Sequence, residues 1–308
     1  MKNNHVSLFG LLIMIMFPLA GYGWWDTGHM AIAAIAYQHL NPETRVWVDE
    51  LVDELDKHYP DTQTFIECST WADDLKKQGI YAYSSWHYTN IPYNPDSLAL
   101  PQNAKPEVDV IWAINQARQV LTAKDAVSLE KARFLAFLVH FVGDLHQPLH
   151  STSMYDDDVP EGNRGGNEFS LKSFKHRNLH MLWDDGCGYF DRWEEKGKLD
   201  RPLGRKGFVA LEEMVSTIMI AHPESSLENL YSLEPTFWAM ESHELAVNAV
   251  FMGTQYVTRS GENQLIQPGD SPSELYMETG REIVEKQLAR AGYRLAMLLN
   301  EIHGNIKH

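Results

Sequence analysis

Apolar residues recur with a period near 3.6 in seven long segments of this 308-residue chain, and this periodicity limits the possible folds more than any other feature. Apolar side chains at that spacing line one face of an α-helix. A single short stretch, 167–171, alternates like a strand or hairpin edge. The sequence therefore predicts a mainly α protein that folds as a single compact helical domain. The expected helices cover residues 29–40, 43–56, 107–122, 128–147, 206–220, 236–257 and 273–302.

Composition excludes several classes of protein. Lys and Arg number 26 against 42 Asp and Glu, a formal net charge of −16, which argues against a basic nucleic-acid coat protein. Hydrophobic residues make up 44% and charged residues 22%, and these values exclude disordered and multi-span membrane chains. Two cysteines are too few for a disulfide scaffold. Cys68 and Cys187 either pair with each other or remain buried free thiols.

Residues 1–23 have the pattern of a secretory signal peptide. A lysine near the start is followed by the apolar run 6–20 and then by small residues at both cleavage-critical positions. The run is too short to span a bilayer, so we expect no stable association with a membrane. Such a signal would direct the protein to a periplasm or the medium, and we expect cleavage after Gly23. The mature domain would occupy residues 24–308 and begin at Trp24.

Two units of the sequence place a histidine and an aspartate four residues apart. His140 and Asp144 lie at the end of an apolar helix, and His180 and Asp184 repeat the spacing. On a helix this spacing stacks both side chains on one face, where imidazole and carboxylate can converge on a metal ion. His150 follows the first unit and can point back toward it. One such pair is more often a surface ion pair, but two are harder to attribute to chance.

Further metal-binding side chains occur beside large aromatic residues. Asp73 follows Trp71, and His87 follows Trp86. His29 lies near the predicted mature terminus. These residues and the two helical units suffice for more than one zinc ion with coordination positions left open, as catalytic sites require.

The remaining histidines, the second aspartate of the Asp73-Asp74 pair and three tryptophans are expected to have structural rather than metal-binding roles. We expect Asp74 to be a solvated neighbour of Asp73 and His146 to pack or to support a ligand. Trp71, Trp86 and Trp183 are expected in the core. Solvated or packed imidazoles are expected at His39, His58, His176, His222, His243, His303 and His308.

Together these motifs resemble the S1/P1 nuclease family, exported zinc-dependent enzymes whose mostly helical fold is similar to that of zinc-dependent phospholipase C. The matching residues run from Trp24 to Asp184, about 160 residues. They are Trp24 with Gly28-His29, Trp71-Ala72-Asp73, His87-Tyr88, the run 134–144, Gln147-Pro148-Leu149-His150, Gly165-Gly166-Asn167, Asn178-Leu179-His180 and Trp183-Asp184.

The resemblance implies three Zn²⁺ ions. Because a free amine at Trp24 exists only after cleavage, processing would complete the third site. Zinc lowers the pKa of bound water from 15.7 to roughly 7, which suits hydrolysis of phosphodiesters at neutral pH. By this resemblance the first ion takes Asp73, His87, His140 and Asp144, the second takes His150, His180 and Asp184, and the third takes His29, Asp144 and the amine and carbonyl of Trp24.

The implied activity is that of an endonuclease that cuts single-stranded DNA and RNA to 5′-phosphorylated products, with 3′-nucleotidase activity in addition. Asp73 would orient the attacking water and Lys76 would meet phosphate charge. Tyr88 would stack on a base, with Asn90 beside it. On spacing alone, Lys76 is explained equally well as a solvated lysine, Tyr88 as core packing and Asn90 as a loop residue. A monomer is the default expectation.

Two other functions remain open from the sequence. Zinc-dependent phospholipase C resembles this chain in the same three-zinc arrangement, but it usually has Glu at the last ligand position, where this chain has Asp184. An exported zinc-binding protein without catalysis is the alternative from another class. Hydrolysis after metal reconstitution would exclude that alternative.

Overall fold

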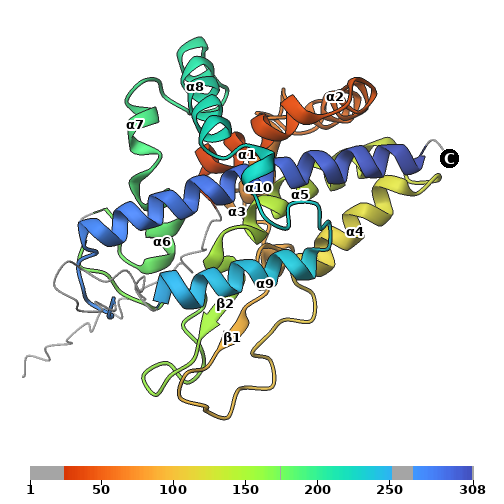
Figure 1. Cartoon of the computed structure of the whole chain (residues 1–308). Helices are drawn as coiled ribbons and strands as arrows, with labels where there is room; N and C mark the ends of the chain where they lie inside the picture. The colour runs from red at the N-terminus through yellow and green to blue at the C-terminus, as the bar shows by residue number, and fades with distance from the viewer. Residues whose placement is uncertain (1–23, 174, 252–265, 307–308) are drawn as a thin grey trace, which may run out of the picture.

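The computed structural model describes residues 24–173, 175–251 and 266–306, and over these residues the chain is mainly α-helical (Figure 1). The prediction of a mainly α fold is confirmed. The predicted signal peptide lies outside the described residues. The longer helices are α1 (Asp26–His39), α2 (Pro42–Asp56), α4 (Val110–Thr122), α5 (Ser128–Leu145), α8 (Arg205–Ala221), α9 (Pro235–Leu245) and α10 (Glu274–Ile306). The short helices are α3 (Trp71–Lys77), α6 (Leu179–Asp184) and α7 (Asp191–Glu194), with single turns η1 (Glu67–Thr70), η2 (Ser84–His87), η3 (Pro148–His150), η4 (Gly186–Gly188) and η5 (Glu224–Ser226), and a π-helical turn η6 (Ala246–Phe251).

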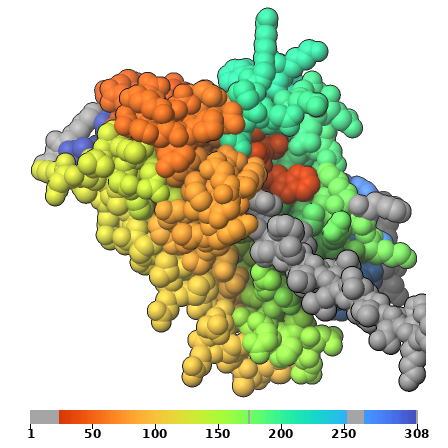
Figure 2. All heavy atoms as spheres, turned by 180° about the vertical axis from the view of Figure 1, so that it is seen from behind, coloured from red at the N-terminus to blue at the C-terminus, as the bar shows by residue number. Residues whose placement is uncertain are grey.

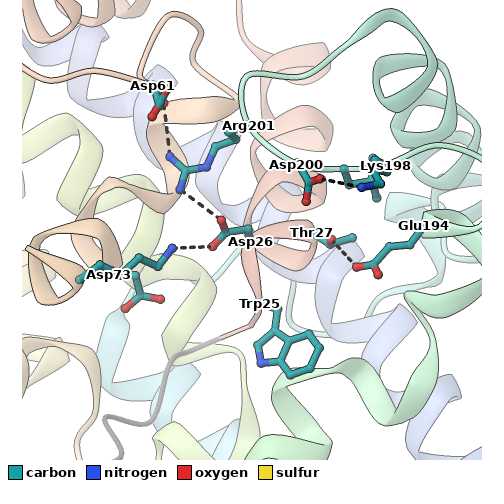
Figure 3. Close-up of a pocket in the computed structure, with 11 residues that line it drawn as sticks. Trp25, Asp26, Thr27, Asp61, Asp73, Glu194, Lys198, Asp200 and Arg201 are labelled. Carbon is teal, nitrogen blue, oxygen red and sulfur yellow. Dashed lines mark hydrogen bonds and ion pairs between the residues drawn. The ribbon is translucent and has the colours of Figure 1, made fainter. Parts of the chain in front are cut away.

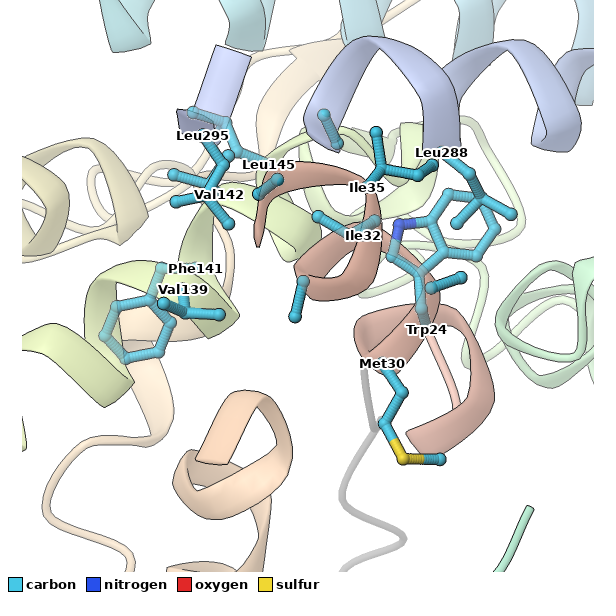
Figure 4. Close-up of a cluster of buried hydrophobic side chains, with 14 of the residues drawn as sticks. Trp24, Met30, Ile32, Ile35, Val139, Phe141, Val142, Leu145, Leu288 and Leu295 are labelled. Atoms are coloured by element: carbon cyan, nitrogen blue, oxygen red, sulfur yellow. The ribbon is translucent and has the colours of Figure 1, made fainter. Parts of the chain in front are cut away.

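Helix α1 lies in the middle of the molecule and packs against α5, α8 and the long α10. Ile32 and Ile35 of α1 are fully buried, and each contributes about 1.5–3 kcal/mol by leaving water. Figure 4 shows these side chains between Leu288 of α10 and the apolar side chains of α5. At Gly292 a Cβ atom would lie 2.6 Å from Ile35, so α10 approaches α1 this closely because position 292 has no side chain.

Helix α5 carries an unbroken buried run from Leu135 to Leu145 and packs against α1, α2, α3 and α4. It ends slightly before the predicted residue 147. Gln147 is extended, with ψ 118°, because the ring of Pro148 disfavours the helical conformation of the preceding residue. The chain then makes the turn η3, which ends at His150. The end of α5 and this turn therefore lie together in the interior.

Residues 167–171, expected as a strand or hairpin edge, do not form one of the strands described, but they contribute one antiparallel bridge. The two strands described are β1 (Ile91–Tyr93) and β2 (Thr152–Met154), which pair in parallel with Ile91 opposite Thr152. In the predicted stretch the backbone N–H of Phe169 donates to the carbonyl of Gly166, 3.2 Å away, and only Ser170 forms an isolated bridge. The Leu171 N–H also donates to the Arg177 carbonyl, and the Leu179 N–H donates to the Phe169 carbonyl, each at 2.9 Å, so the stretch pairs with residues 177–179 through this one antiparallel bridge.

The other predicted helices are found with shifted ends. The expected helix 236–257 is α9 followed by the π-helical turn η6, and residues 252–257 lie outside the described part of the chain. Among the described residues, no helix combines the length and apolar character needed to cross a membrane. Cys68 and Cys187 are both free and buried, which agrees with the free-thiol alternative.

Candidate metal centre

Histidine and aspartate side chains from six elements of the chain meet inside the protein. His140 and Asp144 project from α5, and the distance from His140 Nε2 to Asp144 Oδ2 is 3.2 Å. Within the described residues, three groups each bring their ligand atoms within 4.8 Å of one another. Every member of these groups is buried. The groups are His29, Asp73 and His140; His87, His140 and Asp144; and His150, His180 and Asp184.

The first two groups share His140 and form one cluster, which we call the Asp144 cluster (His29, Asp73, His87, His140 and Asp144). His87 Nδ1 lies 2.9 Å from Asp144 Oδ2 and 3.7 Å from Asp73 Oδ1. His29 Nε2 lies 3.4 Å from Asp144 Oδ1. All four residues predicted around the first ion, together with His29, therefore converge, and Asp144 belongs to the predicted ligand sets of both the first and the third ion.

The third group, which we call the Asp184 cluster (His150, His180 and Asp184), lies beside the first. His180 Nε2 is 3.4 Å and His150 Nε2 is 3.9 Å from a carboxylate oxygen of Asp184. The side chain of Asn178 accepts a hydrogen bond from the Met181 N–H at 2.8 Å, and this cap starts α6 so that His180 and Asp184 fall on one face. The i, i+4 spacing thus brings the imidazole and the carboxylate together on one helical face, as predicted.

Backbone carbonyls fix the orientation of three imidazoles. A carbonyl oxygen only accepts, so the Nδ1 atom that faces it carries the proton, and Nε2 keeps a lone pair for a ligand. This arrangement is typical of metal-binding histidines. The pairs are His140 with Ser69 at 2.7 Å, His150 with His87 at 2.6 Å and His180 with Gly165 at 2.7 Å.

The unpaired atoms of these clusters fit a bound cation. Most buried polar atoms have a hydrogen-bond partner, and leaving one unpaired costs about 1–3 kcal/mol. Among the described residues, several buried ligand atoms of the two clusters have no such partner, and nitrogen and carboxylate donors of this kind suit a borderline metal such as zinc. The atoms are both ring nitrogens of His29, Nε2 of His87, His150 and His180, and Oδ1 of Asp144.

Burial also keeps imidazoles in the form that binds metal. It lowers the pKa of His87 and of His180 to about 3 and lowers that of His29. These rings are therefore neutral at neutral pH, with a lone pair available. For Asp144, burial acts to raise the pKa, but the neighbouring His140 and His150 outweigh it and hold that pKa well below its usual range. His29, His87 and His180 thus present neutral nitrogens, and Asp144 presents an ionised carboxylate.

Trp24 is anchored beside the Asp144 cluster. Its indole is fully buried, and Nε1 donates to the carbonyl of Gly143 at 3.0 Å. A Cβ atom on Gly143 would lie 2.8 Å from Nδ1 of His29, so the absence of a side chain there lets His29 lie against α5. The start of the predicted mature chain is therefore adjacent to the ligands of the predicted third ion.

Comparison with known proteins identifies the family of this chain. The S1/P1 nuclease family model matches residues 24–304. The chain belongs to the S1/P1 nuclease family. Endonuclease 3 of Arabidopsis thaliana is 24% identical over 96% of this chain and 94% of its own length. Nuclease P1 of Penicillium citrinum is 25% identical over 92% of this chain and 98% of its own length, and nuclease S1 of Aspergillus oryzae is 24% identical over 91% and 92%.

Membership confirms the predicted family and identifies a hydrolytic nuclease. It favours this function over a phospholipase C and over a zinc-binding protein without catalysis. The His and Asp clusters described above can hold metal ions in this S1/P1 nuclease.

Lys76 of this nuclease is buried, so its interpretation as a solvated surface lysine is wrong. Its side chain is 5% exposed, and Nζ lies 2.9 Å from Asp73 Oδ1. The expectation that Asp74 is solvated is also wrong, because the guanidinium of Arg201 contacts both of its oxygens at 2.7 and 2.8 Å. The first ion pair lies within α3 and holds the Lys76 ammonium beside Asp73 of the Asp144 cluster, and the second ties α3 to the segment that precedes α8.

Tyr88 and Asn90 line a small pocket of about 90 Å³ above the Asp184 cluster. Both are half-buried, and the pocket also includes His150 and His180. The alternative of Tyr88 as a core residue is therefore wrong. Sequence reasoning missed Arg164, which lines the same pocket beside the turn at the two glycines.

Sequence reasoning also missed Gln147 as a supporting residue. Its Nε2 donates to Asp184 Oδ1 at 2.6 Å, and its Oε1 accepts from the Leu149 N–H at 2.5 Å. His146 packs inside, with Nδ1 donating to the Val142 carbonyl at 2.7 Å. Trp71 and Trp183 are buried and Trp86 packs against the core. None of the histidines expected to be ordinary belongs to a cluster within the described residues, and His308 lies outside them.

Proposed function

We propose that this S1/P1 nuclease is an exported zinc-dependent endonuclease that cuts single-stranded DNA and RNA. The observation that carries the proposal is the set of buried, unpaired ligand atoms in the two clusters. We assign three Zn²⁺ ions to them. Asp73, His87, His140 and Asp144 bind the first, His150, His180 and Asp184 the second, and His29, Asp144 and the main chain of Trp24 the third.

Bound zinc would activate water, neutralise the charge of the phosphate and stabilise the leaving oxygen. The protein orders the reacting groups. Lys76 holds one oxygen of Asp73 by its ion pair, and the carboxylate keeps lone pairs with which to orient the attacking water. The oxygen of that water bonds to phosphorus as the bond to the 3′ oxygen breaks. The products carry a 5′-phosphate and a 3′-hydroxyl.

The pocket at Tyr88 supports a preference for single strands. A base can enter a space of about 90 Å³ only when it is not paired in a duplex, and a tyrosine ring stacks on any base. The same pocket would accept the base of a 3′-nucleotide, and the proposal therefore includes 3′-nucleotidase activity. The full chain carries a formal net charge of −16, so attraction for a long polyanion is weak and binding should weaken further with salt.

Export and activation are linked in this proposal. Residues 1–23 act as the signal peptide, and the catalytic domain of residues 24–308 works as a monomer. Because the Trp24 indole is fixed beside His29 and Gly143, an amine released at Trp24 would lie next to the third ion. A chain that keeps residues 1–23 should therefore bind less zinc and cut more slowly than the processed protein.

The test offers the processed protein a single-stranded oligonucleotide and phosphatidylcholine in parallel. Each reaction is run as purified, after EDTA, and after EDTA followed by zinc. Cleavage of the oligonucleotide that EDTA stops and zinc restores, with 5′-phosphates detected by mass spectrometry, supports the proposal. Cleavage of the lipid alone, or of neither substrate, contradicts it.

A further inference from the structure

A second and larger pocket, of about 710 Å³, adjoins the Asp144 cluster on the side of Asp73. We call it the Trp25 pocket. Figure 3 shows the Trp25 indole below Asp26 and Thr27 within this space. From behind, the red beginning of the described chain lies between the orange segment that includes α3 and the teal-green segment that leads into α8 (Figure 2). Its walls thus come from α1, α3 and the segment between α7 and α8.

The backbone of Trp25 is held by both ligand-bearing regions. Its N–H donates to the Asp184 carbonyl at 3.0 Å, and its carbonyl accepts from the N–H groups of Gly28 and His29 at 2.7 and 3.4 Å. Lys175 Nζ lies 5.4 Å from the centre of the indole, and the ring is half-buried. Trp25 therefore offers a firmly held aromatic surface next to the clusters, with part of the ring open to the pocket.

The cations of this pocket are already paired. Arg201 contacts Asp26 at 3.1 Å as well as Asp74, Lys77 lies 3.7 Å from Asp26, and the exposed Lys198 lies 3.9 Å from Asp200. Each cation of the lining thus has a carboxylate partner. A phosphate would have to break these pairs, whereas a neutral planar ring with polar edges would not. The pocket therefore suits a nucleobase better than a phosphate.

We propose that the Trp25 pocket binds the nucleobase on the opposite side of the cut phosphodiester from the nucleoside held at Tyr88. This proposal rests on the nuclease function proposed above. The Tyr88 pocket is lined by His150 and His180, and the Trp25 pocket by Asp73. A single strand whose phosphate lies over the ligands between them places one base in each pocket. Because stacking on an indole tolerates every base, this second contact adds affinity without sequence preference.

The experiment removes one base at a time from the substrate. The substrate is a tetranucleotide in which only the central phosphodiester can be cut, because methylphosphonates replace the flanking linkages. Two further versions lack the base on the 5′ side or the 3′ side of the cut. For the zinc-loaded wild-type protein, loss of either base should lower kcat/KM about tenfold, the size of one stacking contact.

Trp25→Ala should make kcat/KM insensitive to one of the two bases and leave the tenfold dependence on the other. Tyr88→Ala should do the reverse. Trp25→Phe keeps an aromatic face and should retain both dependences, while Trp25→Leu keeps bulk alone and should behave like Trp25→Ala. Tyr231→Ala, which removes an aromatic side chain 74% exposed and outside both pockets, is the matched control and should match the wild type.

Two results overturn the proposal alone. One is that Trp25→Ala and Trp25→Leu keep the wild-type dependence on both bases. The other is that the Trp25 and Tyr88 variants lose dependence on the same base. Circular dichroism shows whether Trp25→Ala is folded. If it is not folded, the dependence of kcat/KM on the two bases in Trp25→Leu tests the proposal instead. If the wild-type protein cuts none of the substrates, the function proposed above fails, and this proposal fails with it.

Discussion

The two ligand clusters shift the pKa of a buried carboxylate in opposite directions. In the Asp144 cluster, burial acts to raise the pKa of Asp73, but Lys76 and the nearby histidines lower it further than burial raises it. In the Asp184 cluster, burial raises the pKa of Asp184 well above its usual range, and the hydrogen bond from Gln147 only opposes this. The first cluster therefore carries its own positive partners, and the second has an uncharged amide in that role.

The difference shows two ways to prepare a buried metal ligand. Asp73 stays ionised in the protein alone because a lysine lies 2.9 Å away. Asp184 needs a cation from outside to favour its ionised form. Metal removal should consequently disturb the two clusters unequally, and the following variants test that comparison from the largest effect to the smallest.

His140→Ala should abolish cleavage and release zinc while the helical core remains folded. His140 belongs to two of the three ligand groups, and no neighbouring side chain can replace its Nε2 atom. The measurements are oligonucleotide cleavage, zinc content and far-ultraviolet circular dichroism. His58→Ala, at an exposed histidine, is the control. Full activity of His140→Ala would show that the metal assignment is wrong.

Asp184→Asn should remove about one equivalent of zinc and lower kcat about a hundredfold, the effect of losing about 3 kcal/mol of charge stabilisation. The metal-free variant should melt at a higher temperature than the metal-free wild type. The sign follows because a carboxyl whose pKa is raised by folding destabilises the fold at neutral pH, and an amide carries no such charge. Loss of all the zinc would show that the clusters are not separable.

Lys76→Met should lower the free energy of unfolding of the metal-free protein by about 3 kcal/mol, because it leaves the buried Asp73 carboxylate without its partner. Zinc should reduce this loss, since a cation then lies near the same carboxylate. Urea unfolding with EDTA or with zinc measures both values. Lys57→Met, at an exposed ion pair, should change neither. An equal loss in both conditions would contradict the comparison.

Gln147→Leu should weaken zinc binding at the Asp184 cluster about tenfold and leave the Asp144 cluster unchanged, because its amide orients Asp184 alone. Competition with a chelator of known affinity measures each equivalent of zinc. Gln38→Leu, at an exposed glutamine of α1, is the matched control. A uniform loss from every site would mean that Gln147 acts through the fold as a whole.

The long helices could be predicted from the sequence because each buries one face, and apolar residues on a buried helical face recur with a period of about 3.6 residues. The short α3 and α6 could not, although they carry Asp73 and His180. A helix of six or seven residues makes fewer than two turns and shows no clear period. The ligands on them could be predicted in other ways: His180 and Asp184 repeat the i, i+4 spacing of His140 and Asp144, and Asp73 belongs to a motif of the family that the chain resembles.

The supporting contacts were beyond prediction for a different reason. The acceptors for His140 and His180 are the carbonyls of Ser69 and Gly165, and every residue has a carbonyl. Nothing in the sequence indicates which of them will face an imidazole. The burial of Lys76 was equally hidden, because it depends on how α3 packs against α5.

Gly143 donates no side-chain atom to the metal centre, yet it decides whether His29 can belong to it. A methyl group at this position would overlap the space of Nδ1 of that histidine and crowd Ile32. A homologous chain could therefore keep every predicted ligand and still lose one binding position through a single alanine. A comparison that checks only the metal-binding residues would predict a complete site in such a chain. A reliable comparison must also check that glycine is kept where a side chain would displace a ligand.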